Sequence, residues 1–106
     1  MKLSKEGILK QLGYSESDLD RLDEVIKHTP GFEKIINHIV DLNDKLKHTK
    51  SFVGFSNSVP HLKIKIESLS TELKNEAEEI IKKWSEKYNV ILEKVKEGVY
   101  YIKKVI

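Results

Sequence analysis

The chain has 106 residues, of which 39% are hydrophobic and 34% charged, and its formal net charge is +2. This balance excludes a disordered chain, and a chain of this length buries about two-thirds of its unfolded surface, so we expect one domain over residues 1–106. Without cysteine there is no disulfide or thiolate metal site, and without a long apolar run we expect no signal peptide, no membrane span and a cytoplasmic location.

The first 48 residues predict a helical layer. A first helix runs from Ser4 to Leu12, with Ser4 as N-cap and Gly13 as the stop. A second helix follows Ser17, which is suited to cap it, and ends where residues 28–31 (His-Thr-Pro-Gly) break the pattern.

A third helix is predicted from about Phe32 to Lys47. Thr29 is its expected N-cap and Pro30 its first helical residue. Apolar residues recur there at three- and four-residue spacing, as on the buried side of a helix: Phe32, Ile35, Ile39, Leu42 and Leu46.

Residues 49–61 contain glycine, serine, asparagine and proline and predict a loop, within which Ser51 to Phe55 can form a short strand. From residue 62 the period changes. Leu62, Ile64 and Ile66 alternate with lysines, which predicts a strand with one apolar and one exposed face.

A helix is predicted over residues 69–88. Glutamates fill its first half and lysines its end, in agreement with the helix dipole, and Asn89 is suited to a left-handed residue that ends it. Its apolar side is expected to lie in the core: Leu69, Leu73, Ala77, Ile80, Ile81, Trp84 and Tyr88.

Residues 90–106 predict a β-hairpin around Lys96-Glu97-Gly98, because glycine suits the left-handed last position of a three-residue loop. Its strands are apolar on both faces at 90–92 and 99–102, so we expect them to lie centrally in a sheet. A second interpretation stays open. Apolar residues from Ile66 to Ile106 also follow an eleven-residue spacing that fits one long coiled-coil helix, although Gly98 and Asn89 disfavour it.

The predicted fold class is therefore α+β: an N-terminal layer of about three helices (1–48), a loop or short strand (49–61), and a β-α-β-β unit (62–106) with a small antiparallel or mixed sheet. The alternative is an all-α fold with a long C-terminal coiled-coil helix. We expect strand 99–105 to lie between 62–66 and 90–95, helix 69–88 to cover one face of the sheet, and the helix around 35–46 to cover the other. Lys63 and Lys65 mark 62–66 as an edge strand, because lysine discourages pairing with other chains.

Catalytic and metal-binding patterns are weak, so we expect no enzyme, no metal and no cofactor. The sequence lacks a nucleophile elbow, a phosphate-binding glycine loop and an H-E-x-x-H motif. Four polar residues share one side of the third helix but spread over three turns, too far apart for one ion: His38, Asp41, Asp44 and His48. Four acidic residues at the second helix lack the glycine and final glutamate of a calcium loop: Asp18, Asp20, Asp23 and Glu24.

Two surfaces are candidates for a protein partner. One is the acidic side of the second helix, formed by the four acidic residues just named. The other is the segment with Phe52, Val53 and Phe55, which would form an apolar patch if exposed, although we favour its burial.

A lysine-rich sheet surface is the candidate for nucleic acid, with His61 and either Tyr100 or Tyr101 nearby. Lysines neutralise phosphates and aromatic rings stack on bases. Arg21 is the only arginine, which weakens sequence-specific recognition. The lysines of this surface are Lys63, Lys65, Lys94, Lys96, Lys103 and Lys104.

The leading hypothesis is a small, non-enzymatic cytoplasmic module that binds protein, either another chain or a second copy of itself, in an interaction or regulatory role. The alternative is a weak, sequence-tolerant nucleic-acid-binding protein that uses the lysine-rich sheet surface. Neither hypothesis involves a membrane or a small-molecule substrate.

Overall fold

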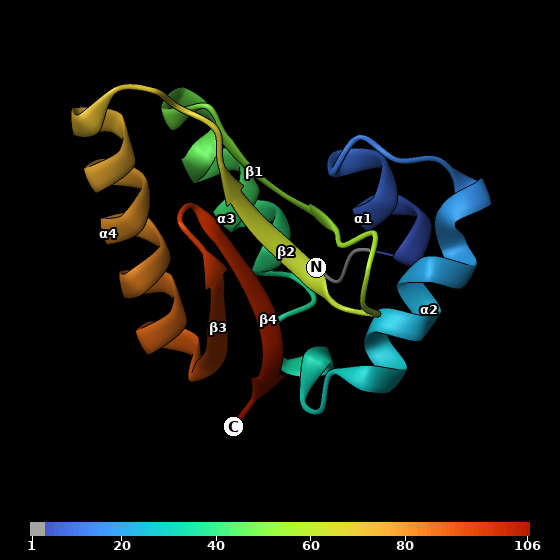
Figure 1. The fold of residues 1–106 in the computed structure, drawn as a ribbon. Helices are drawn as coiled ribbons and strands as arrows, with labels where there is room; N and C mark the ends of the chain where they lie inside the picture. The colour runs from blue at the N-terminus through green and yellow to red at the C-terminus, as the bar shows by residue number, and fades with distance from the viewer. Residues whose placement is uncertain (1–3) are drawn as a thin grey trace.

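The computed structural model describes residues 4–106, which form four α-helices and a four-stranded antiparallel sheet (Figure 1). The helices are α1 (Lys5–Gln11), α2 (Leu19–His28), α3 (Ile39–Leu46) and α4 (Thr71–Tyr88). The strands are β1 (Ser51–Phe55), β2 (Leu62–Ile66), β3 (Val90–Lys96) and β4 (Val99–Val105). The predicted α+β class is confirmed, and the all-α alternative is wrong because residues 90–105 form a hairpin.

Local signals set the ends of α1 and α4. The Ser4 hydroxyl accepts a hydrogen bond from the Gly7 N–H at 3.0 Å, and the Ser70 hydroxyl accepts one from Leu73 at 3.3 Å. Asn89 ends α4 in the left-handed conformation, with φ of 55°. Since α4 begins at Thr71, Leu69 lies outside it and is 96% exposed, so its expected burial is wrong.

The second and third predicted helices begin later than expected. A short 3-10 helix, Glu16–Asp18, precedes α2, so Ser17 does not cap it. The third is divided: Phe32–Lys34 form another 3-10 helix, and α3 begins only at Ile39. At this start the Trp84 indole N–H donates to the His38 carbonyl at 3.1 Å, so α4 helps to position the first turn of α3. The apolar spacing therefore predicted correctly which residues of this segment are buried, but it wrongly predicted one continuous helix.

The sheet has the strand order β1-β2-β4-β3, with antiparallel neighbours throughout. The predicted position of β4 between β2 and β3 is confirmed. β1 pairs along the whole of β2, from Ser51 opposite Ile66 to Phe55 opposite Leu62. This pairing places β2 in the interior, so its assignment as an edge strand is wrong. β3 is an edge strand and largely exposed, contrary to the expected central position.

Helices α3 and α4 cover the same face of the sheet. Leu42 of α3 and Ile81 and Trp84 of α4 join Ile64 and Ile102 in one core. The expectation that α3 covers the second face is wrong, because β2 has only one apolar face and it is already buried under both helices. The other face, which we call the open face, has none of the four α-helices across it.

The two edges of the sheet are protected in different ways. On β1, the Val53 N–H donates to the Asn43 side chain and the Phe55 N–H to the Tyr14 hydroxyl, both at 2.9 Å. On β3, the edge carries exposed lysines and a register shift between Lys94 and Lys96. Lysines and bulges discourage pairing with another chain, so strand addition is not a favoured route to assembly.

Gly31→Ala is expected to lower the free energy of unfolding by about 2–4 kcal/mol. Gly31 has φ of 79°, and a Cβ there would lie 2.3 Å from the Val105 carbonyl oxygen. Gly13→Ala is the matched control, because Gly13 has φ of 89° but no atom within 4 Å of an added Cβ. Backbone strain alone then costs about 1–2 kcal/mol. Urea unfolding of both variants measures the difference. Equal losses of unfolding free energy in the two variants would contradict the role of the contact between residue 31 and the Val105 carbonyl.

Candidate nucleic-acid interface

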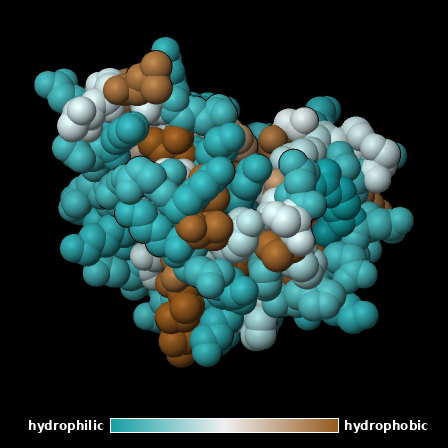
Figure 2. Space-filling view, in the orientation of Figure 1, coloured by the Kyte–Doolittle hydropathy of each residue, from teal (hydrophilic) through white to brown (hydrophobic). Residues whose placement is uncertain are grey.

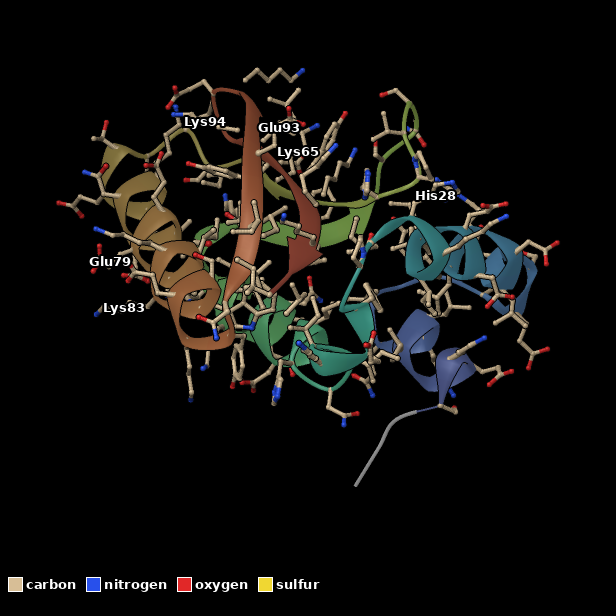
Figure 3. All side chains as sticks on the ribbon, turned by 90° about the horizontal axis from the view of Figure 1, so that it is seen from below. His28, Lys65, Glu79, Lys83, Glu93 and Lys94 are labelled. Atoms are coloured by element: carbon tan, nitrogen blue, oxygen red, sulfur yellow. The ribbon has the colours of Figure 1, made fainter. Side chains whose placement is uncertain are left out.

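The register aligns side chains of all four strands in two rows across the open face. One row is Phe52, Lys65, Val99 and Lys96, and the other is Gly54, Lys63, Tyr101 and Glu93. Directly opposite residues share a face of an antiparallel sheet. Figure 3 shows Lys65 and Glu93 together on the upper side of the sheet, with α3 below it.

Four of the six predicted lysines share this face. Lys63, Lys65 and Lys96 belong to the two rows just described. Lys103 also lies on this face, because its Nζ is 3.8 Å from the carboxylate of Glu93. Lys94 does not, because it pairs with Tyr100 in the core-face row. The Glu97 carboxylate lies 3.4 Å from Lys94 Nζ, and its negative charge is the main cause of the raised pKa of Lys94. Lys104 is exposed and lies opposite Ile91, beyond a register shift.

A hollow of about 340 Å³ lies on the open face between the β1–β2 loop and the β3–β4 hairpin. We call it the lysine hollow. Figure 2 shows this side of the molecule as mainly hydrophilic, with small hydrophobic patches. Its lining holds three lysines and no carboxylate: Ser56, Asn57, Ser58, Lys63, Lys65, Val95, Lys96, Val99 and Tyr101.

Two other hollows differ in charge. The larger, of about 560 Å³ between α4 and β3, has Glu78 and Glu79 beside Lys82, and its Tyr100 has a pKa raised mainly by burial. A hollow beside α2 holds Arg21 and Glu24. Of these three, the lysine hollow alone has cationic side chains without an acidic neighbour in its lining.

The lysines of the hollow are weakly neutralised by the protein. Within residues 4–106, neither Lys63 nor Lys96 has a carboxylate oxygen within 4 Å, and Lys65 lies 3.5 Å from Glu67. Exposed ion pairs of this kind contribute about 0–1 kcal/mol. The three ammonium groups are therefore available to an anion.

Three hydroxyl groups lie together at one end of the hollow. The Ser56 hydroxyl donates to Tyr101 Oη at 3.3 Å, and Ser58 Oγ lies 3.5 Å from the same oxygen. Ser56 Oγ also accepts from the Ser58 and Val59 N–H groups, at 3.2 and 3.4 Å. Hydrogen bonds with Ser56 and Ser58, and then the charge of Lys63, lower the Tyr101 pKa, while burial opposes this shift. The phenol is thus a strengthened hydrogen-bond donor.

His61 anchors the loop that carries these serines. Its side chain is buried, and Nδ1 lies 3.2 Å from the Thr29 hydroxyl at the end of α2. Its backbone carbonyl accepts from Ser56 N–H at 3.1 Å. The loop therefore has a fixed position relative to the sheet and to α2.

Stability is expected to fall as the pH is lowered from 7 to about 5.5, in part through His61. Burial, followed by the charges of Lys103 and His28, lowers the His61 pKa below 6.5, while Glu93 and a hydrogen bond with Ile102 oppose this shift. Below pH 6.5 the unfolded chain then takes up a proton that the folded chain does not, so unfolding becomes more favourable. Urea unfolding across this range should show a shallower pH dependence for His61→Gln. An unchanged dependence would contradict this role.

The two surfaces expected for a protein partner are less available than the lysine hollow. Val53 and Phe55 are only 1% and 4% exposed, in agreement with the burial that the sequence favoured. Phe52 is half-buried and lies on the open face. Of the acidic residues, three lie within 4 Å of a basic side chain of this chain: Asp18 with Arg21, Asp23 with Lys5, and Glu24 with His28. Asp20 is exposed.

The sequence did not identify Ser56, Asn57 and Ser58, and it did not choose between Tyr100 and Tyr101. Strand alternation from the Gly98 turn could have assigned Tyr101 to the lysine face, but nothing in the sequence placed the serines beside it. Within residues 4–106, no group of histidines and carboxylates could hold a metal ion, and no helix is long and apolar enough to cross a membrane.

Comparisons with protein families, with curated proteins and with solved structures found no match.

Proposed function

We propose that this chain is a non-enzymatic binding protein whose open face binds single-stranded nucleic acid with little sequence preference. The lysine hollow is the observation that carries this proposal: three lysines without a carboxylate in the lining, next to a tyrosine hydroxyl. Lysines neutralise phosphates regardless of sequence. Phe52 and Tyr101 lie in the same rows as the lysines, where unpaired bases can contact their rings.

Fluorescence anisotropy with mixed-sequence single-stranded and duplex oligonucleotides tests this proposal. We expect the single strand to bind more tightly than the duplex, because only its bases are free to contact the rings. Three lysine–phosphate contacts predict that log K falls with log salt with a slope of about −2. Absence of salt-sensitive binding at low ionic strength would contradict the proposal.

A second candidate, the protein-interaction module, is favoured by one observation. Leu69 is 96% exposed beside a hollow of about 160 Å³ that Ile66 and Gly98 help to line. Single exposed apolar residues are common on soluble proteins, so this candidate ranks second. Sedimentation equilibrium would show self-association that Leu69→Ser removes, and a monomer at all concentrations would count against self-association through Leu69.

A further inference from the structure

We infer that the lysine hollow receives the terminal phosphate of a nucleic-acid strand, and that Tyr101 Oη donates a hydrogen bond to it. This inference rests on the proposed function and deepens it, because it specifies which part of the strand occupies the hollow.

The size of the hollow suits a terminal phosphate group. The β1–β2 loop, with Ser56 and Ser58, bounds one side, and in Figure 3 this loop rises above the sheet near His28. Val95 and Lys96 bound the other side, where β3 has an additional residue relative to β4. The volume of about 340 Å³ is near the lower end of small-ligand sites, roughly 300–1,000 Å³. A terminal phosphate group fits within this volume, between the loop on one side and the hairpin on the other.

The charge of the hollow also favours a chain end. A terminal phosphate carries a charge of about −1.5 to −2 near pH 7 and has three acceptor oxygens. A phosphodiester carries one negative charge and has two such oxygens. Lys63, Lys65 and Lys96 surround the hollow with no carboxylate in its lining, so the more highly charged group gains more from them.

Tyr101 is oriented to donate. The Ser56 hydroxyl donates to Tyr101 Oη, so the phenol keeps its own proton for a different acceptor. Ser58 Oγ, at 3.5 Å, is a distant partner, and an anionic phosphate oxygen is a stronger acceptor. The Ser56 oxygen is itself fixed by two backbone N–H groups, which positions the pair before a ligand arrives.

The test compares three internally labelled oligonucleotides of one sequence, with a 5′-phosphate, a 3′-phosphate or hydroxyls at both ends. We expect one phosphorylated form to bind the full chain about tenfold more tightly than the hydroxyl form. Tyr101→Phe and Ser56→Ala should bring the ratio of these affinities toward 1, because the first removes the donor and the second removes the hydroxyl that orients it. Lys83→Gln is the control, because Lys83 lies on α4 with its side chain 74% exposed and should alter neither affinity.

The possible failures are distinguishable. Equal affinity for all three oligonucleotides would overturn the terminal-phosphate inference and leave the proposed function standing. No binding of any of them would overturn both. An unchanged ratio in both Tyr101→Phe and Ser56→Ala, with folding verified by circular dichroism, would contradict the role of the hydroxyl groups.

Discussion

A triple variant, Lys63→Gln, Lys65→Gln and Lys96→Gln, is expected to bind a single-stranded oligonucleotide about 100-fold more weakly at about 0.1 M salt. These lysines line the hollow on the open face and have no carboxylate beside them in its lining. Each lysine–phosphate contact contributes about 0.7 to log K for every tenfold decrease in salt below 1 M, so removing all three lysines lowers log K at 0.1 M by about two. The salt slope should fall toward zero in the same variant.

The matched control removes the same charge from the helical side of the molecule: Lys45→Gln, Lys82→Gln and Lys83→Gln. These residues are exposed on α3 and α4, which lie on the other side of the sheet from the hollow. We expect its affinity to stay within about threefold of the unaltered protein, since exposed charges beyond a Debye length are largely screened. Equal losses of affinity in the two triple variants would show that net charge, and not the open face, determines binding.

Trp84→Ala is expected to destabilise the fold by about 3–5 kcal/mol, a large part of the total of about 5–15 kcal/mol for such a domain. The Trp84 side chain is 4% exposed, packs edge-on against Tyr88 and donates to the His38 carbonyl. It thus connects α4 with the first turn of α3. This variant removes both the buried ring and the hydrogen bond.

Trp84→Phe separates the two contributions. It keeps an aromatic ring in the core but leaves the His38 carbonyl without the indole donor, and we expect a loss of about 1–3 kcal/mol. Urea unfolding followed by far-ultraviolet circular dichroism measures both variants, because Trp84 is the only tryptophan and its fluorescence is absent from each. A loss below about 1 kcal/mol for Trp84→Ala would contradict the assignment of this side chain to the core.

Features set by neighbouring residues were predictable from the sequence. Ser4 capped the first helix, Asn89 ended α4, and Gly98, with φ of 78°, turned the hairpin. The alternation in 62–66 correctly separated the core face of β2 from its lysine face. In each case a backbone preference or a short period within one element determined the result.

Features set by interactions between distant residues were not predictable. Whether β2 lies at an edge depended on β1, a five-residue strand whose outer N–H groups bond to Asn43 and Tyr14. Lys94 and Lys96 are two residues apart and were expected on one face, but the register shift between them places them on opposite faces. The serines meet Tyr101 because His61 anchors their loop to Thr29, 32 residues away in sequence.

The central claim is that the open face is the binding surface, and an NMR titration with a single-stranded oligonucleotide tests it most directly. We predict that the largest amide shift changes fall on Ser58, Lys63, Lys96 and Tyr101, and that the exposed side of α4 around Lys83 is unaffected. Shift changes concentrated on α4 or on the acidic side of α2, or no shift changes at low salt, would contradict the claim.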